Sequence, residues 1–403
     1  MNIITNLLMF FLAFSLPFHY TFNNWILGIC YIVFVFNFVN NREIFSIKSF
    51  YDNGGVSIVL FFLVILIGIT YSQNPKEAYE YLVRVIPMLL SPLLFMSCES
   101  FYKKYSKYIF KGLILGCLIA VLICWGNVLY GVISNNEPIS YIFRHRHLNN
   151  KLTEIIGIHP SYLSLFVVTS IAIIINIYET LDNRLKLISK ILINIFTVFL
   201  FTLLARNILF FYLISVIVFL IINRKWKLLT LIGVFILLFI SIVFKIDDQY
   251  NYLRKKVIYS IPLLGDKGSI SRFDRLKATK YMFLQHPIFG VGTCDSKYYR
   301  QNYYLETNDK IAYEKEYNAH NQFFEYLDEL GIIGGAVYLL FFIQSFRLAF
   351  RYNDFLLGYI TLLFFVSNLT ESMLQRTHGV VYFSLIFSLI FSKYISQKPF
   401  CEV

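Results

Sequence analysis

The chain has 403 residues, of which 57% are hydrophobic and only 15% are charged. A soluble domain carries about 25% charged residues, so this composition excludes a set of soluble domains and indicates one polytopic membrane protein. It also excludes a disordered chain, a collagen-like repeat and a disulfide scaffold, and the six cysteines form no disulfide or zinc motif. The net charge of +12 does not indicate a nucleic-acid partner, because membrane proteins carry excess lysine and arginine in their cytoplasmic loops.

Apolar stretches predict about twelve transmembrane helices, since a helix needs about 20 apolar residues to cross about 30 Å of hydrocarbon. The N-terminal stretch has no basic start and no small-residue cleavage site, so we interpret it as a retained first span. The predicted spans lie near Ile4–Tyr20, Trp25–Phe38, Val56–Tyr71, Leu82–Met96, Ile109–Ile133, Ser161–Tyr178, Ile188–Ala205, Ile208–Ile222, Leu228–Phe244, Phe323–Phe346, Phe355–Leu369 and Val380–Ile395.

Lysine and arginine are distributed unequally between alternate loops. Sixteen fall in one set of loops and seven in the opposite set, when one long loop is left out. The positive-inside rule places the richer set in the cytoplasm. Both termini are then cytoplasmic, which requires an even number of spans, and the long loop of residues 245–320 lies on the outer face.

Arg206 interrupts an apolar stretch that is too long for one span. A single helix over Ile191–Ile222 would contain thirty-two residues and would measure about 48 Å at 1.5 Å per residue. The chain is therefore predicted to turn near Arg206, in a hairpin between short helices that holds the arginine slightly below the outer surface. Such a residue is either functional or paired, or it is an arginine that snorkels to the headgroups.

The outer loop contains its own helix signal over residues 271–287. An amphipathic pattern at three- and four-residue steps places four residues on one side of this helix: Phe273, Leu276, Lys280 and Leu284. Pro287 ends the helix, and a glycine-containing turn follows. Periodicity alone favours a helix that caps the bundle over one that lies along the membrane surface.

The loop returns to the membrane at His320, directly before an apolar helix. A neutral imidazole there can accept a proton near pH 7, but a single histidine at a helix start is more often structural than catalytic. Gly331, Gly334 and Gly335 follow in a stretch predicted to be helical. Each glycine costs about 1 kcal/mol there relative to alanine, and each permits close helix packing.

Several familiar catalytic motifs are missing from the sequence. It contains no Walker A, His-Glu-x-x-His or Gly-x-Ser-x-Gly pattern, so no motif indicates ATP, zinc or a serine nucleophile. Charged residues lie at the ends of spans and in the long outer loop. This distribution favours an enzyme that acts at the membrane surface over a transporter or flippase, which tends to show repeated halves and polar groups at mid-membrane.

These residues together resemble the O-antigen ligase/polymerase superfamily of bacterial envelope glycosyltransferases, among which the O-antigen ligases fit best. The family pattern is His, then Asn, Ser or Gln, nine residues, Gly, two residues, and finally Gly, Thr or Tyr. His320, Asn321, Gly331 and Gly334 match its fixed positions, at the end of a long loop as in the family.

Four further stretches carry the resemblance. Residues 370–374, Thr-Glu-Ser-Met-Leu, look like the stretch that precedes the last span of the family. Ser271-Arg272 matches the step that opens the loop helix of the family, and His286–Gly292 matches its His-Pro-x-x-Gly-x-Gly turn. Arg206 corresponds to the family's arginine at a helix hairpin, although the serine that usually precedes that arginine is Ala205 here. The resemblance covers most of residues 155–395.

The predicted fold is an all-α polytopic membrane protein with about twelve transmembrane helices and one long, partly helical loop between spans 9 and 10. Residues 1–244 are predicted to form spans 1–9, residues 245–320 the loop, and residues 321–403 spans 10–12 with a short cytoplasmic tail. The resemblance implies a bacterial inner-membrane location, with the loop and the active site in the periplasm.

The resemblance also implies the reaction and its partners. The donor is a glycan on undecaprenyl pyrophosphate, the acceptor is lipid A–core or another glycan, membrane lipids surround the protein, and no cofactor or divalent metal takes part. We expect His320 to be the general base and Arg206 and Arg272 to bind the donor pyrophosphate, with Arg275 as a further phosphate contact. Asn321, Gly331 and Gly334 are the remaining motif residues.

Related activities remain open on sequence. An O-antigen or capsular polysaccharide polymerase shares the topology, the loop and the donor, but it uses a second lipid-linked repeat as acceptor. A protein O-oligosaccharyltransferase of the same superfamily transfers the glycan to serine or threonine. A polysaccharide transporter or flippase is the alternative from another class of protein.

Overall fold

The computed structural model describes residues 2–41, 50, 54–96, 101–138, 141–142, 144, 147–227 and 272–396. The described residues form helices and turns without a β-strand. Six of their helices are long and apolar enough to cross a membrane, and five shorter helices are also apolar. These helices confirm the predicted all-α membrane fold. The predicted span Leu228–Phe244 lies outside the described residues, so the count of twelve stays a prediction.

The chain divides into two compact units. Unit 1 contains residues 1–16, 20–115 and 270–403, and unit 2 contains residues 17–19 and 116–269. The long helix α6 (Phe101–Ser134) contributes its first part to unit 1 and its second part to unit 2.

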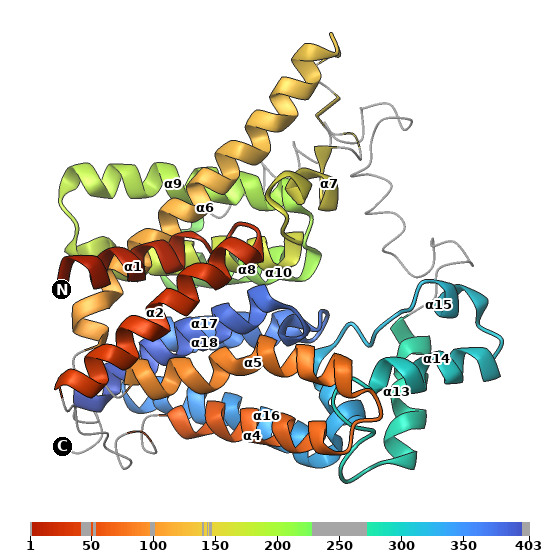
Figure 1. Ribbon diagram of the computed structural model, residues 1–403. Coiled ribbons are helices and arrows are strands. Elements are labelled where there is room, and N and C mark those ends of the chain that lie inside the picture. Colours follow the sequence, from red (N-terminus) through yellow and green to blue (C-terminus); the bar gives the residue numbers. More distant parts are fainter. Residues whose placement is uncertain are drawn as a thin grey trace. The chain divides into compact units, whose positions relative to one another are not determined.

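Unit 1 is a helix bundle with a small helical cap at one end (Figure 1). The pairs of its helices that pack together include α5 with α18, α4 with α5, α4 with α16, and α16 with α17. The helices of the bundle are α1 (Asn2–Phe14), α2 (Tyr20–Asn41), α4 (Gly55–Thr70), α5 (Pro75–Met96), α16 (Gln322–Arg351), α17 (Phe355–Asn368) and α18 (Thr377–Ser392). The cap consists of α13 (Arg272–Gln285), α14 (Ser296–Glu306) and α15 (Lys310–Glu314).

Helix α18 packs against α5 and α4 in unit 1. Its sequence is apolar on all sides, with serines between the large residues, and nearly all of its side chains are buried. A helix that is apolar all round is expected in such a core position. Phe383 and Phe387 of α18 pack against Phe341 of α16, with ring centroids 4.7 and 4.8 Å apart. Each such aromatic pair adds about 0.5–1.5 kcal/mol beyond its burial.

Unit 2 is built around α8 (Pro160–Ile177), which packs against α9 (Asn183–Leu203) and α10 (Arg206–Ile222). Pro160 occupies the first turn of α8, where its missing N–H leaves no hydrogen bond unmade. His159 caps this helix, because its side chain accepts a hydrogen bond from the backbone N–H of Ser161 at 3.3 Å. On unit 2's part of α6, the ring of Trp125 lies 5.5 Å from that of Phe199 on α9.

The connections of unit 1 that were predicted to be on the outer face gather at one end of its bundle, which we call the outer end. Ser72 in the connection between α4 and α5 contacts Asp295 of the loop, and Glu371 in the connection between α17 and α18 contacts His320. At the opposite end, Asp354 accepts hydrogen bonds from Lys393 and Tyr394 at 2.6 and 2.8 Å. The cap of α13, α14 and α15 lies at the outer end (Figure 1).

Candidate active site

Helix α16 is broken at Gly331, where the sequence predicted a continuous helix. Gly331 has φ 63° and ψ −158°, a conformation that an L-residue adopts only under strain. The segment before the break carries three acidic residues, and the segment after it is apolar. The prediction of close packing by helical glycines therefore needs correction at Gly331, which ends one helical segment and starts another.

The turn of residues 287–292 docks against this break through the backbone. The N–H groups of Val291 and Gly292 donate to the carbonyl oxygens of Asp328 and Glu329 at 2.9 and 3.0 Å, and Ile332 N–H donates to Pro287 at 2.9 Å. These bonds satisfy backbone groups that the broken helix leaves without intrahelical partners. The turn and the glycine motif, which lie about forty residues apart in the sequence, thus form one structural element.

Glycine is required on both sides of this contact. A Cβ atom at Gly331 would collide with the carbonyl of Ile288 and would lie 2.7 Å from the backbone nitrogen of Gly290. A Cβ atom at Gly290 would collide with the backbone at Glu329 and Leu330. Gly334 lies in the helical segment after the break, where a Cβ atom would meet the side chain of Leu330. The glycines therefore allow a turn to approach a broken helix.

The loop is also anchored to the connection between α4 and α5. Asp295 accepts hydrogen bonds from the backbone N–H groups of Gln73 and Asn74 at 2.7 and 3.2 Å, and from the hydroxyl of Ser72 at 3.0 Å. Thr293 is buried and donates to the carbonyl oxygen of Ile65 at 3.0 Å. A buried carboxylate with three donors is a strong anchor, because hydrogen bonds to ionised groups are about twice as strong as neutral ones.

His320 lies at the outer end, directly before α16, in the left-handed region with φ 46°. Its Nδ1 atom is 3.4 Å from Oε2 of Glu371, and about a third of each side chain is exposed, 35% for His320 and 33% for Glu371. Asn321 caps α16, because its side-chain oxygen accepts from the N–H groups of Phe323 and Phe324 at 2.9 and 3.2 Å. This geometry places an accessible imidazole beside a carboxylate.

The segment that carries Glu371 is held in place by α5 and α16. The side-chain oxygen of Gln322 accepts from the N–H of Leu374 at 2.6 Å, and Asn321 donates to the carbonyl oxygen of Leu369 at 3.0 Å. Arg84 of α5 donates to the carbonyl oxygen of Gln375 at 2.5 Å. The position of Glu371 relative to His320 is thus fixed from both of its sides.

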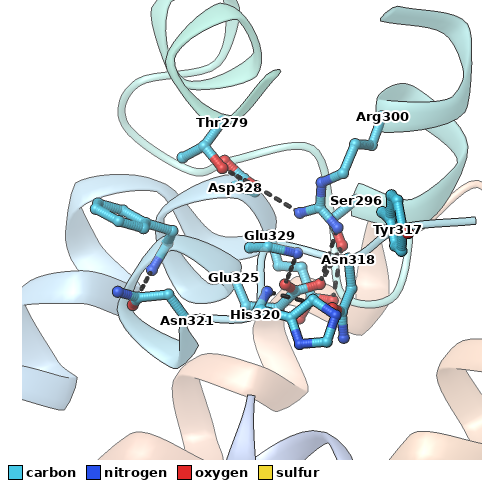
Figure 2. A network of polar contacts seen from close by, with 12 residues as sticks. Thr279, Ser296, Arg300, Tyr317, Asn318, His320, Asn321, Glu325, Asp328 and Glu329 are labelled. Atoms are coloured by element: carbon cyan, nitrogen blue, oxygen red, sulfur yellow. Dashed lines mark hydrogen bonds and ion pairs between the residues drawn. The ribbon is translucent and has the colours of Figure 1, made fainter. Parts of the chain in front are cut away.

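A buried charge network joins the cap to the first segment of α16 (Figure 2). Arg300 of α14 is only 1% exposed and donates to Glu325 at 3.3 Å and to Asp328 at 2.7 Å. Ser296 donates to Glu325 and Glu329 at 3.2 and 3.1 Å. Burial alone lowers the pKa of Arg300, but Glu325 and Asp328 outweigh burial and raise it above its ordinary value, so the guanidinium stays charged.

Helix α13 is present as predicted, but the side that packs differs from the predicted apolar side. Leu284 is 67% exposed, and Leu276 and Lys280 are also exposed. The buried side carries Ala278, Thr279 and Met282, and Thr279 donates to Asp328 of α16 at 3.1 Å. The small residues let α13 approach α14 and α16 closely, and this side of the helix is recognised only when its partners are known.

Of the two arginines of α13 that were predicted to bind the donor, the structure describes the side chain of Arg275 but not that of Arg272. Arg275 places its guanidinium carbon 4.3 Å from the ring centre of Tyr317, three residues before His320. A stacked guanidinium of this kind gains a cation–π attraction of about 0.5–2 kcal/mol. Arg272 is the first residue of α13, and its side chain lies outside the described residues. Ser271, which was predicted to open the helix, lies outside them as well.

The hairpin at Arg206 has the predicted form. Helix α9 ends at Leu203, Leu204 turns the chain in the left-handed region with φ 53°, and Arg206 is the first residue of α10. The side chain of Arg206 is exposed. Helix α9 begins at Asn183, capped by Asp182, so it is longer than the predicted short helix. Arg206 belongs to unit 2, whereas His320, Asn321, Gly331, Gly334 and Arg275 belong to unit 1.

Sequence reasoning missed Arg300, Glu325, Asp328, Glu329 and the position of Glu371. One signal was available for the three acids of α16, because charged residues inside an otherwise apolar helix are rare and are usually functional or paired. Their spacing of three and four residues also places them near one another on the helix. No sequence signal identifies Arg300 as their partner, because it lies twenty-five or more residues away.

Taken together, these features define a helical membrane protein whose unit 1 presents a histidine–carboxylate pair at the outer end of its bundle, with Arg275 in the adjoining cap. Residues 191–339 match the family model described as O-Antigen ligase. The match confirms the resemblance to the O-antigen ligase superfamily and supports a membrane enzyme that transfers glycans. The matched segment contains every predicted site residue, from Arg206 to Gly334. No curated protein matches the chain.

Proposed function

We propose that the protein is an O-antigen ligase-like glycosyltransferase. It moves a glycan from undecaprenyl pyrophosphate to a sugar hydroxyl of lipid A–core, without a metal ion or other cofactor. The enzyme lies in the bacterial inner membrane with both termini in the cytoplasm, and the transfer takes place at the periplasmic face. The unequal distribution of lysine and arginine between alternate loops supports this orientation.

The pair of His320 and Glu371 is the observation that carries the proposal. When Nδ1–H of the imidazole faces Oε2 of Glu371 at 3.4 Å, Nε2 is the atom that can accept a proton. A carboxylate in that position fixes the tautomer and stabilises the imidazolium that forms, as in other histidine bases. The contact is long for a hydrogen bond, as catalytic contacts often are before substrate binds.

The chemistry follows from these roles. The acceptor hydroxyl gives its proton to Nε2 of His320 as its oxygen bonds to the anomeric carbon of the donor sugar. The bond from that carbon to the pyrophosphate oxygen breaks, and its electron pair leaves with the lipid pyrophosphate. Direct displacement of this kind inverts the anomeric centre. General base catalysis typically contributes about 10²–10⁴-fold.

Arginines neutralise the leaving group in this proposal. Arg206, Arg272 and Arg275 bind the pyrophosphate oxygens, where negative charge grows as the glycosidic bond breaks. Guanidinium groups suit this role because they donate two parallel hydrogen bonds to a phosphate. Fixed positive charge at the position where charge develops lowers the barrier. The stacking of Arg275 on Tyr317 supports its part, since it orders the guanidinium against the segment that leads to His320 before substrate arrives.

A lipopolysaccharide gel of a deletion strain tests the proposed acceptor, with lipid-linked glycan assayed in the same cells. We expect lipid A–core without attached repeats, together with accumulated long lipid-linked chains. Core that carries a single repeat would instead indicate a polymerase. A normal ladder would contradict both activities and would point to a protein O-oligosaccharyltransferase or to another envelope polysaccharide.

A single variant tests the proposed base. His320→Ala should insert normally and lose transfer by about 10²–10⁴-fold, as measured with purified full-length protein, lipid-linked donor extracted from the deletion strain, and lipid A–core. Full transfer by a well-expressed His320→Ala protein would overturn the assignment.

A further inference from the structure

Glu325 connects the buried charge network to the backbone directly before His320 (Figure 2). It is only 4% exposed. Its Oε2 atom accepts the backbone N–H of Ala319 at 3.2 Å, and its Oε1 atom accepts from Ser296 at 3.2 Å and from Arg300 at 3.3 Å. One carboxylate oxygen of Glu325 therefore binds the segment that carries His320, and the other binds the cap.

The backbone at His320 needs such support. An L-residue in the left-handed region costs about 1–2 kcal/mol, and His320 has φ 46°. Strained residues persist where the surroundings fix them from several directions. The N–H of His320 donates to Asn318 at 3.2 Å, the following residue Asn321 caps α16, and Ala319 is held by Glu325. The contact with Glu325 is the one in this group that comes from a charged side chain.

Glu325 is paired with a residue of the cap. A buried carboxylate without a partner is strongly destabilised, and Arg300 of α14 supplies the positive charge beside it. The same guanidinium binds Asp328 at 2.7 Å. The conformation of His320 is in this way coupled to the cap, which also carries Arg275 on α13.

We propose that Glu325 is a positioning residue for His320, and that Arg300 holds its carboxylate in place. Through the Ala319 N–H, Glu325 holds the strained backbone that directs the imidazole toward the acceptor hydroxyl. This inference rests on the proposed role of His320 as general base. It predicts that loss of Glu325 lowers kcat and leaves the KM for the donor nearly unchanged, because the pyrophosphate contacts are not part of this network.

The chain offers a matched pair of variants. Glutamine at 325 has one acceptor oxygen, so it cannot serve both Ala319 and the pair of Arg300 and Ser296. Asparagine at 328 keeps the oxygen that faces Arg300 and Thr279, and its new amino group replaces Oδ1, which has no hydrogen-bond partner among the described residues. Each variant replaces one carboxylate oxygen beside Arg300 by an amide nitrogen, but only Glu325→Gln disturbs the contact with Ala319.

The experiment measures transfer from undecaprenyl-pyrophosphate-linked glycan to lipid A–core by the full-length protein, at equal amounts of folded enzyme. We expect Glu325→Gln to lower kcat about tenfold or more with the donor KM within about twofold, and Asp328→Asn to keep kcat within about threefold. Equal losses of kcat in the two variants would overturn the proposal, as would an unchanged kcat or a loss confined to KM in Glu325→Gln.

A double-mutant cycle separates positioning from general damage. If Glu325 acts through His320, then Glu325→Gln should change the residual rate of His320→Ala by less than about twofold, because residues that act as a unit are strongly non-additive. Multiplicative losses would contradict positioning. Full transfer by His320→Ala in the same assay would instead refute the proposed base, and the two failures are thus distinguishable.

Discussion

The contact between the outer loop and the broken helix α16 makes a sharp prediction for Gly331→Ala. The new methyl group would occupy the space of the Ile288 carbonyl and would lie 2.7 Å from the backbone nitrogen of Gly290. It would also have to adopt φ 63°. Because the obstacles are backbone atoms, no side-chain rotation can relieve the collision, and the turn of residues 287–292 is expected to move away from α16.

The magnitude follows from the bonds that this movement breaks. The left-handed conformation costs alanine about 1–2 kcal/mol. The turn makes three backbone hydrogen bonds to the break, through the N–H groups of Val291, Gly292 and Ile332, and each contributes about 0.5–1.5 kcal/mol net. The free energy of opening this contact should therefore fall by about 2.5–6.5 kcal/mol. Since 1.4 kcal/mol corresponds to a factor of ten, hydrogen exchange of these amides should accelerate about 10²-fold or more.

Hydrogen exchange of the purified full-length protein, resolved to the peptides that contain these amides, measures the effect. Gly28→Ala is the matched control, because α2 is helical at this position and no atom lies within 4 Å of the added methyl group. That change should stabilise α2 by about 0.5–1 kcal/mol and leave exchange in the outer loop unchanged. Wild-type protection of Val291, Gly292 and Ile332 in a folded Gly331→Ala protein would refute the reasoning.

Three further predictions follow from the structure and the proposed reaction. Glu371→Gln should lower kcat about tenfold or more with little change in donor KM, because the amide cannot stabilise an imidazolium at His320; wild-type kcat would contradict the pairing. Arg206→Lys should impair transfer, since an ammonium cannot form the bidentate contact, and unchanged kinetics would leave Arg206 as a headgroup anchor. Burial opposes ionisation of Asp354, but hydrogen bonds from Lys393 and a backbone N–H outweigh it and lower its pKa. Its stabilising effect is therefore complete above about pH 4 and is lost as the pH falls through the lowered pKa. The difference in thermal unfolding midpoint between the wild type and Asp354→Asn should stay constant from about pH 7 to about pH 4. A smaller difference already at about pH 5 would contradict a lowered pKa of Asp354.

The sequence by itself determined the class of the protein and most of its helices. Apolar length and low charge predict membrane helices because each helix satisfies its own backbone and only needs enough apolar residues to cross the bilayer. The turn before Arg206 followed from the same argument, since one helix would have been too long. The motif at His320 was also recognisable, because its residues are close together in the sequence.

The tertiary structure alone decided which distant residues meet. Glu371 lies fifty-one residues after His320, and Arg300 lies twenty-five residues before Glu325, so no local pattern predicts either pair. The break in α16 at Gly331 could not be predicted from the local sequence either. It is stabilised by three backbone hydrogen bonds between the broken helix and a turn some forty residues earlier in the chain. The side of α13 that packs against the protein could not be predicted for the same reason. Hydrophobic periodicity selects the side with Leu276 and Leu284, whereas α13 packs through Ala278, Thr279 and Met282, where the hydroxyl of Thr279 meets Asp328 of α16.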